Sequence, residues 1–212
     1  MKIHICKDNK VFPFLYIDNW YSPEEEKLIW RELDFYTIRS PMLFHRAEKD
    51  PATGKHLDGT TKSKAHRIYI DTLYRRRDAS HLLRLHPLKM ASEEVQNAIK
   101  AAGPNFRVYG QTNCDTTMLN YYEDHDYYAS HSDIAMMTSI CWFHRKPKAY
   151  TGGNLTFKDI KFTLECKHNR LVLFPGYYFH QVDAIKMKKK KEIGWGRYAI
   201  ENFYNTVNTP LK

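Results

Sequence analysis

The feature that most constrains the fold is a series of short β-prone runs, separated by turn residues, in the second half of the 212-residue chain. Short strands at this spacing are typical of an antiparallel sandwich or barrel. The sequence shows no internal repeat and no linker, so we expect a single domain over residues 1–212. The predicted strands are Arg107–Gln111, Thr116–Tyr122, Ser139–Phe143, Asn154–Phe157, Leu171–Phe174, Gln181–Ile185 and Arg197–Phe203.

We place the core at about residues 107–205, and we expect residues 1–106 to support it with strands and helices. Lys2–Cys6 and Val11–Ile17 predict a strand pair joined by a turn at Asp8–Lys10. Arg67–Asp71 alternates like a further strand. Ser40–His66 is rich in proline, glycine and charged residues, and it predicts a long loop that could line a binding site.

Three helices are predicted in the same half of the chain. One begins at Ser22, which forms a capping-box pattern with Glu25. Another lies within Leu73–Leu88, ends before its proline, and has solvated arginines. A third begins at Ser92 and ends at Gly103, which a proline follows. The fold class is therefore α+β, with helices flanking a β-rich core.

Composition excludes several classes of protein. Hydrophobic residues make up 42% and aromatic residues 14%, which is typical of a globular chain. No apolar run is long enough to cross a bilayer, and the N-terminus has no secretory pattern, so we expect a soluble cytoplasmic protein without a membrane partner. The four cysteines, scattered and without a C-x-x-C pair, predict reduced thiols rather than a zinc ribbon or disulfides: Cys6, Cys114, Cys141 and Cys166.

The net charge is +9, and five lysines fall within Lys186–Lys191. A cluster of this kind can bind nucleic acid or an acidic surface. We prefer to interpret it as the solvated tip of a hairpin. The charge is a weak indication of partners and says nothing about chemistry.

Two H-x-D triplets occur, at His56–Asp58 and at His131–Asp133. On composition alone, roughly one such triplet is expected by chance. The first lies in a loop without a β pattern. The second lies in an extended segment, where residues i and i+2 point to the same face. His180 follows a strand and a tight turn, so it can complete a set of two histidines and one carboxylate, the facial triad of non-haem Fe(II) oxygenases.

These residues resemble the 2-oxoglutarate- and Fe(II)-dependent dioxygenases, and within them the prolyl 4-hydroxylase-like group, including members encoded by bacteriophages. The resemblance covers about residues 117–203. Its elements occur in the family's order: Tyr121, Tyr122 and Tyr128, then His131-Ser132-Asp133, then Gly152–Phe157, then Arg170–Pro175 leading to His180, and finally Arg197–Ile200.

The resemblance implies a double-stranded β-helix, or jelly roll, whose catalytic metal ligands are His131, Asp133 and His180. It implies Fe(II) and 2-oxoglutarate as cofactors, with ascorbate as a further candidate. It also implies that Arg197 binds the distal carboxylate of 2-oxoglutarate, a paired contact to which a guanidinium is suited. Lys190 is the rival for that role, because the interval from His180 to Arg197 is longer than usual in the family.

The cosubstrate pocket departs from the family at one further position. Trp142 stands where related enzymes often have a tyrosine that contacts the cosubstrate. Tyr121 or Tyr122 is the candidate replacement.

The resemblance implies oxidation of a C–H bond by O2, with 2-oxoglutarate converted to succinate. A prolyl or related peptide is the preferred substrate, and the chain would act in the cytoplasm, or in the host cytoplasm if a phage encodes it. The candidate walls of a peptide groove are the Ser40–His66 loop and the tyrosines Tyr121, Tyr122, Tyr127 and Tyr128.

Two alternatives stay open. A nucleic-acid demethylase of the same superfamily fits the net charge and Asn120-Tyr121-Tyr122, but the C-terminal stretch lacks that family's second arginine. A non-catalytic jelly-roll binding protein would need neither the intact ligand set nor the carboxylate-binding arginine.

Overall fold

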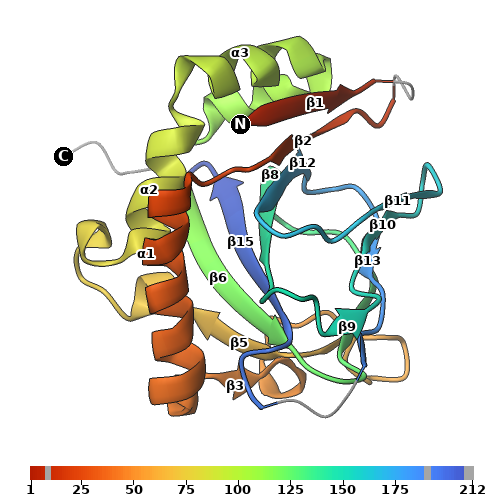
Figure 1. Ribbon diagram of the computed structural model, residues 1–212. Helices are drawn as coiled ribbons and strands as arrows, with labels where there is room; N and C mark the ends of the chain where they lie inside the picture. Colours follow the sequence, from red (N-terminus) through yellow and green to blue (C-terminus); the bar gives the residue numbers. More distant parts are fainter. Residues whose placement is uncertain (8–10, 189–191, 208–212) are drawn as a thin grey trace.

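The computed structural model describes residues 1–7, 11–188 and 192–207. Two antiparallel sheets face each other as a jelly roll, with helices on the outer side of the larger sheet (Figure 1). The larger sheet has the order β1 (Lys2–Cys6), β2 (Phe14–Asp18), β12 (Arg170–Pro175), β8 (Met137–Phe143), β15 (Arg197–Asn205), β6 (Cys114–Tyr122), β5 (His66–Tyr69) and β3 (His45–Arg46).

The smaller sheet has the order β11 (Phe162–Leu164), β10 (Leu155–Phe157), β13 (His180–Val182), β7 (Tyr127–His131) and β4 (Ser63–Lys64). A separate strand pair joins β9 (Tyr150–Thr151) to β14 (Lys186–Met187). The predicted fold class is confirmed. Four strands from the first 106 residues belong to the larger sheet, so this part of the chain shares a layer with the core: β1, β2, β3 and β5. The single domain over residues 1–212 stays a prediction.

The larger sheet is buried on both faces, and its side chains alternate between two cores. On β15, Tyr198 and Ile200 pack in the cluster that includes the helices. Ala199 packs in the cluster between the two sheets, and Arg197 and Glu201 share its face of the strand by the two-residue period. This alternation decides which residues of each strand reach the space between the sheets.

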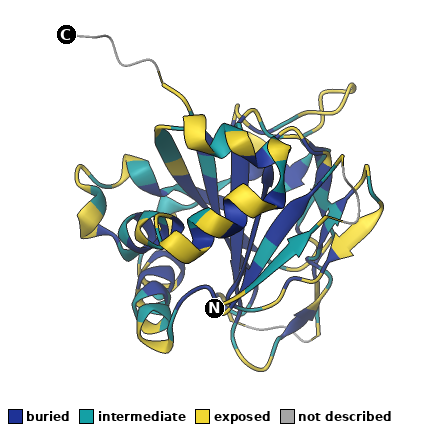
Figure 2. Cartoon of the chain, turned by 90° about the horizontal axis from the view of Figure 1, so that it is seen from above, coloured by how far each residue is buried: buried dark blue, intermediate teal, exposed yellow. Residues whose placement is uncertain are grey.

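Three helices cover the outer face of the larger sheet: α1 (Pro23–Asp34), α2 (His81–Met90) and α3 (Glu93–Ala102). Their outer surfaces are exposed and their inner surfaces are buried (Figure 2). The capping box at Ser22 is confirmed: its hydroxyl accepts from the Glu25 N–H at 3.2 Å, and the Glu25 carboxylate accepts from the Ser22 N–H at 2.8 Å. Gly103 ends α3 with φ of 122°, a conformation that favours glycine.

Several predictions for residues 40–111 need correction. Arg107–Gln111 is not a strand, because it belongs to a 3₁₀ helix over Pro104–Gln111 that buries Phe106. Five residues of mixed polarity do not distinguish an alternating strand from a tight helical turn. This segment continues directly from the end of α3, where the Phe106 N–H donates to the Gly103 carbonyl at 3.1 Å.

The helix predicted within Leu73–Leu88 begins later and does not end at its proline, since Pro87 lies inside α2. The buried Glu32 carboxylate fixes the start of α2, because it accepts from the backbone N–H groups of His81 and Leu82 at 2.7 and 3.1 Å. The arginines before α2 are not all solvated, because Arg77 forms ion pairs with two aspartates.

The segment 40–66 has more structure than the predicted loop. It contains β3, β4 and two short 3₁₀ helices, and Asp50 and Thr53 within it are buried. Arg67 of β5 holds it in place: its Nη1 donates to Asp50 Oδ2 at 3.0 Å and to Thr53 Oγ1 at 2.8 Å. These hydrogen bonds hold the segment against the larger sheet.

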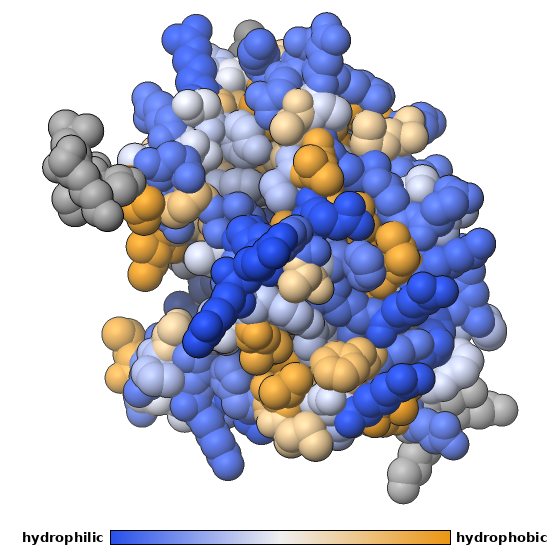
Figure 3. Space-filling model, turned by 90° about the vertical axis from the view of Figure 1, so that its left-hand side faces the viewer, coloured by the Kyte–Doolittle hydropathy of each residue, from blue (hydrophilic) through white to orange (hydrophobic). Residues whose placement is uncertain are grey.

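The structure also bears on the cysteines, on membrane-spanning helices and on the character of the surface. No disulfide joins any of the four cysteines. No helix in residues 1–7, 11–188 or 192–207 has the length and apolarity that a membrane span requires. The helix side of the molecule is mostly hydrophilic, with apolar side chains scattered over it (Figure 3). Scattered exposed apolar residues are normal on a protein surface. The Asp8–Lys10 turn and Lys189–Lys191 lie outside the described residues.

Candidate metal centre

The structure brings His131, Asp133 and His180 together between the two sheets. His131 ends β7 and His180 begins β13, and the two are direct cross-strand partners. One ligand atom from each residue lies within 4.8 Å of the others. The Nε2 atoms of both histidines are 3.7 Å from the Asp133 carboxylate, one near each of its oxygens. Within the described part of the chain, this is the group of ligand residues that could hold a metal ion.

Backbone carbonyls orient both imidazoles. The Nδ1 of His131 lies 2.9 Å from the Ala129 carbonyl, and the Nδ1 of His180 lies 2.8 Å from the Tyr178 carbonyl. A carbonyl can only accept, so each Nδ1 donates and each Nε2 keeps its lone pair for a metal. The same tautomer in both rings is the usual arrangement around a metal-bound histidine.

The carboxylate is also held from outside the triad. Thr138 Oγ1 of β8 donates to Asp133 Oδ2 at 2.6 Å, and the Asp133 N–H donates to the Gly176 carbonyl at 2.8 Å. A Cβ on Gly176 would lie 2.0 Å from the Ala135 carbonyl oxygen, so only glycine fits there. The sequence analysis missed this contact of Thr138 with the candidate site, because nothing in its sequence context marks it.

Burial keeps His131 in the neutral form that binds metal. His131 and His180 are 8% and 2% exposed. Burial, with a further contribution from His180, holds the pKa of His131 well below its usual range. Two imidazoles and one carboxylate match the donor set of a mononuclear Fe(II) centre. In contrast, His56 and Asp58 are exposed on the hairpin of segment 40–66 and lie outside this group.

Arg197 lies at the start of β15, fully buried. Its Nε, Nη1 and Nη2 atoms have no hydrogen-bond partner in residues 1–7, 11–188 and 192–207. Its guanidinium carbon lies 4.7 Å from the ring centroid of Tyr122 and 5.8 Å from that of Trp142. Tyr122 and Trp142 each add a buried polar atom without a partner in the same described ranges. Buried donors without an acceptor are rare, so this group is suited to an anionic ligand such as a carboxylate.

The structure separates the two candidate tyrosines. Tyr121 points into the helix-side cluster, where its hydroxyl accepts from the N–H groups of Gly194 and Gly196 at 2.7 and 3.2 Å. Tyr122 points to the opposite face, toward Arg197. Adjacent residues of a strand cannot share a face, so only one tyrosine can serve the pocket. Of the two tyrosines, Tyr122 is therefore the candidate for contact with the cosubstrate, and Tyr121 is not. The rival Lys190 lies outside the described residues.

Gly153 explains part of the glycine pair before β10. Its φ is 72°, and a Cβ on it would lie 2.9 Å from Arg197 Cδ. The glycine therefore leaves room for the arginine stem, and it adopts a backbone conformation that most residues avoid. This contact places the motif Gly152-Gly153 directly against the side chain of Arg197.

A second polar group lies on the same inner face, and the sequence analysis did not assign it to the site. Arg67 Nε donates to Asn120 Oδ1 at 3.0 Å, and Asn120 Nδ2 donates to Glu201 Oε1 at 2.9 Å. Arg67, Asn120 and Glu201 are all buried. Glu201 is four residues after Arg197 on one strand, so strand periodicity could have placed both side chains on one face.

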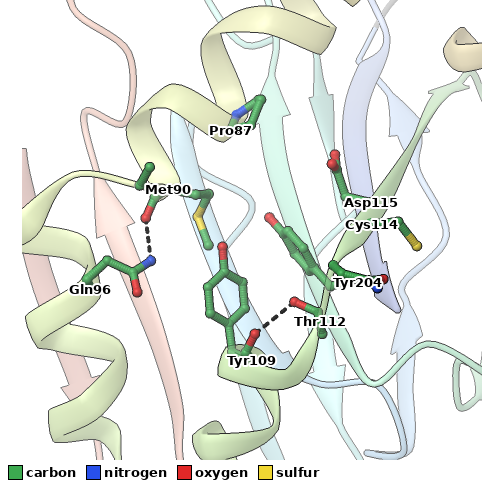
Figure 4. Close-up of a pocket in the computed structure, with 10 residues that line it drawn as sticks. Pro87, Met90, Gln96, Tyr109, Thr112, Cys114, Asp115 and Tyr204 are labelled. Atoms are coloured by element: carbon green, nitrogen blue, oxygen red, sulfur yellow. Dashed lines mark hydrogen bonds between the residues drawn. The ribbon is translucent and has the colours of Figure 1, made fainter. Parts of the chain in front are cut away.

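A separate surface pocket of about 370 Å³ lies at the other end of β6 and β15 (Figure 4). Its lining includes Tyr109, Asp115 and Tyr204 but no triad residue. Two hydrogen bonds join residues that line it, from Gln96 Nε2 to the Met90 carbonyl and from Thr112 Oγ1 to the Tyr109 carbonyl. We do not assign this pocket to the metal centre.

No protein-family model matches the chain, and no curated protein matches it in sequence. Solved structures match its fold. A Pseudomonas putida prolyl-4-hydroxylase aligns with a TM-score of 0.59 and 12% identity, covering 95% of this chain and 97% of that one. A Trichoplax adhaerens prolyl hydroxylase, solved with a hypoxia inducible factor peptide fragment, aligns with a TM-score of 0.58 and 15% identity, covering 91% and 83%.

A Burkholderia pseudomallei oxidoreductase of the 2OG-Fe(II) oxygenase family aligns with a TM-score of 0.55 and 11% identity, covering 92% of this chain and 86% of that one. The coverage shows that nearly the whole chain shares one architecture with these proteins. The chain therefore has the jelly-roll fold found in prolyl hydroxylases and 2OG-Fe(II) oxygenases, as the resemblance predicted.

Proposed function

We propose that the chain is an Fe(II)- and 2-oxoglutarate-dependent oxygenase that hydroxylates a C–H bond of a prolyl or related peptide substrate. The observation that carries the proposal is the fully buried Arg197 guanidinium, which has no acceptor in the described chain and lies in the same inter-sheet space as the triad. A triad alone would fit many metal enzymes. A triad with a buried carboxylate-binding arginine fits a reaction that uses an acidic cosubstrate.

In this proposal His131, Asp133 and His180 would hold the iron. Iron bound there supplies, with 2-oxoglutarate and O2, the oxidation of the substrate C–H bond. The side chains of the protein do the positioning. The Nδ1–H groups of both histidines fix the rings, and Thr138 fixes the carboxylate. Ascorbate is a candidate for keeping the iron reduced.

Arg197 would anchor one carboxylate of 2-oxoglutarate, and the hydroxyl of Tyr122 and the indole N–H of Trp142 are further donors. The opposite end of the cosubstrate could then reach the triad. Tyr128 covers the triad from the side of segment 40–66, because its ring stacks on His131 with the centroids 3.6 Å apart. Together these contacts would orient the cosubstrate and limit the entry of water.

The peptide substrate is supported by two of the structures that share the fold. One is named a prolyl-4-hydroxylase, and another was solved with a peptide fragment. Nucleic acid remains the alternative partner. We also propose a cytoplasmic location, to which cysteines without disulfides are suited, while phage origin rests on the resemblance alone.

The experiment is succinate release from 2-oxoglutarate in the presence of Fe(II) and ascorbate, ranked by the stimulation that proline-containing peptides and methylated oligonucleotides produce. We expect peptides to stimulate more. His131→Ala should abolish both metal binding and turnover, and His56→Ala, the matched change in the exposed triplet, should change neither. Loss of the metal in His56→Ala but not in His131→Ala would refute the site. Stronger stimulation by a methylated oligonucleotide would favour the demethylase.

A further inference from the structure

Glu201 and Arg67 form a polar pair that the proposed chemistry does not use. Glu201 comes from β15 and Arg67 from β5, and Asn120 of β6 lies between them. The Asn120 amide bonds to both side chains, so it fixes the positions of both. The pair is therefore built into three adjacent strands of the larger sheet, with no contribution from the tip of a loop.

Each member of the pair keeps one unused hydrogen-bonding group. Arg67 is 2% exposed, with its Nε on Asn120 and its Nη1 on Asp50 and Thr53, but its Nη2 has no partner in residues 1–7, 11–188 and 192–207. Glu201 is 7% exposed, and its Oε1 accepts from Asn120. Its second oxygen, Oε2, is not part of that hydrogen bond. Because Arg67 and Glu201 both bond to the Asn120 amide, a donor and an acceptor are held near each other.

The pair lies next to the metal centre. The guanidinium carbon of Arg67 is 5.9 Å from the ring centroid of Tyr128, and that ring stacks on His131. Glu201 lies opposite Ile140 of β8, two residues from Thr138, the residue that donates to Asp133. Burial, and to a smaller degree the Asp133 carboxylate, raise the pKa of Glu201 to about 7, although the Asn120 hydrogen bond opposes this. A substrate group beside the reacting atoms would therefore meet this pair.

The charges favour a neutral ligand group. Asp50 already neutralises Arg67 at 3.0 Å, so an anion would gain little there and would be repelled by Glu201. A cation would face the guanidinium of Arg67. One residue of an extended peptide turns its own C=O and its own N–H to the same side, and these two groups satisfy Arg67 Nη2 and Glu201 Oε2 together without burying a new charge.

Resting on the oxygenase function above, we propose that Arg67 Nη2 and Glu201 Oε2 form a binding subsite for the C=O and the N–H of one extended substrate residue, next to the residue that reacts. The carbonyl oxygen accepts from Arg67, and the N–H donates to Glu201. The subsite selects an amino acid within a peptide chain over a free amino acid, which has no neighbouring amide. Arg67 and Glu201 are then specificity-determining residues.

The test uses two probes that differ in one N–H: acetyl-prolyl-glycinamide, and its ester analogue in which oxygen replaces the N–H that follows the proline. Each is titrated calorimetrically into protein loaded with Mn(II) and 2-oxoglutarate, so that no turnover occurs. The wild type should bind the amide at least roughly tenfold more tightly than the ester, because the ester leaves Glu201 without its donor.

Glu201→Gln keeps the size of the side chain and an oxygen for Asn120, but it turns an N–H₂ group toward the substrate. We expect this variant to lose the preference for the amide while it still binds Mn(II) and 2-oxoglutarate. Glu165→Gln, the same change at an exposed glutamate, should keep the preference of the wild type.

An unchanged preference in Glu201→Gln would overturn the subsite. So would tighter binding of free L-proline than of the blocked peptide, or no binding of either probe to the loaded wild type. Failure of the oxygenase function itself shows differently, since the wild type would then not bind 2-oxoglutarate at all.

Discussion

Replacing Arg197 by methionine removes the guanidinium and keeps an unbranched stem in the space between Tyr122 and Trp142. Arg197 makes no hydrogen bond or ion pair with another described residue, so the substitution breaks no such contact in the protein. It does remove the donors that we assign to the cosubstrate carboxylate. The variant therefore separates binding of 2-oxoglutarate from the stability of the fold.

The expected loss of affinity follows from the burial of the site. Removing one partner of a buried, hydrogen-bonded charge pair costs about 2–5 kcal/mol. At about 1.4 kcal/mol for each factor of ten, the affinity for 2-oxoglutarate should fall by at least roughly 30-fold. The melting temperature of the metal-free protein should stay the same or rise, because a buried charge without a partner is replaced by an apolar side chain.

The assay is calorimetric titration of 2-oxoglutarate into the Mn(II)-loaded variant, with thermal unfolding measured in parallel. Arg170→Met is the matched control. Arg170 is also buried in the larger sheet, but it is paired with Asp18 at 2.7 Å, so its loss should lower stability and leave the affinity for 2-oxoglutarate unchanged. Unchanged affinity in Arg197→Met, or a large loss in Lys190→Ala with Arg197→Met unaffected, would refute the assignment of Arg197.

Three further changes have definite outcomes. Thr138→Val removes the donor to Asp133 and should weaken Mn(II) binding by about 10- to 100-fold in a calorimetric titration; an unchanged affinity would remove Thr138 from the site. Gly153→Ala should displace the Arg197 stem and lower 2-oxoglutarate affinity by roughly tenfold with Mn(II) binding intact, and equal loss of both would indicate general misfolding. The third concerns pH. The pKa of Glu201 is about 7 in the folded protein and about 4.3 in the unfolded chain. The stability that the protonated side chain contributes is therefore fully present below the unfolded pKa, and it is lost as the pH rises to 7. Chemical denaturation of metal-free protein should show Glu201→Gln gaining about 2–3 kcal/mol over the wild type between pH 5 and pH 8, whereas a pH-independent difference would contradict a raised pKa.

The triad could be predicted from sequence because its chemistry restricts it to few residue types. The spacing of His131 and Asp133 predicted that they face the same way, although β7 ends at His131 and Asp133 follows it. His180 follows a recognisable strand and turn. The two H-x-D triplets were separated by context, since only the second lies among β-prone runs. The exposed position of His56 and Asp58 agrees with that choice.

The choice between Tyr121 and Tyr122 needed the structure. Both strand faces are buried, so the alternation of apolar and polar residues that usually identifies the inner face is absent. The contacts of Arg67 and Glu201 could not be predicted from the sequence either. They depend on pairing among β5, β6 and β15, which are far apart in the sequence, and an isolated arginine or glutamate carries no signal of burial.

Errors in the first half arose where tertiary contacts overrode local signals. Pro87 is a helix breaker by propensity, yet α2 extends past it, because Glu32 of α1 fixes its start and its apolar side chains pack on the sheet. The segment 40–66 was predicted as a loop from its composition, but the pair of Asp50 and Arg67 holds it as a wall. Both contacts, Glu32 with His81 and Asp50 with Arg67, join residues that are far apart in the sequence.

A crystal structure with Mn(II) and 2-oxoglutarate tests the central claim most directly, because anomalous scattering locates the metal independently of the fold. We expect one strong anomalous peak at roughly 2.0–2.3 Å from the Nε2 atoms of His131 and His180 and from an Asp133 oxygen. We also expect one carboxylate of 2-oxoglutarate within hydrogen-bonding distance of the Arg197 guanidinium. A peak at any other set of ligands, or 2-oxoglutarate bound away from Arg197, would contradict the account.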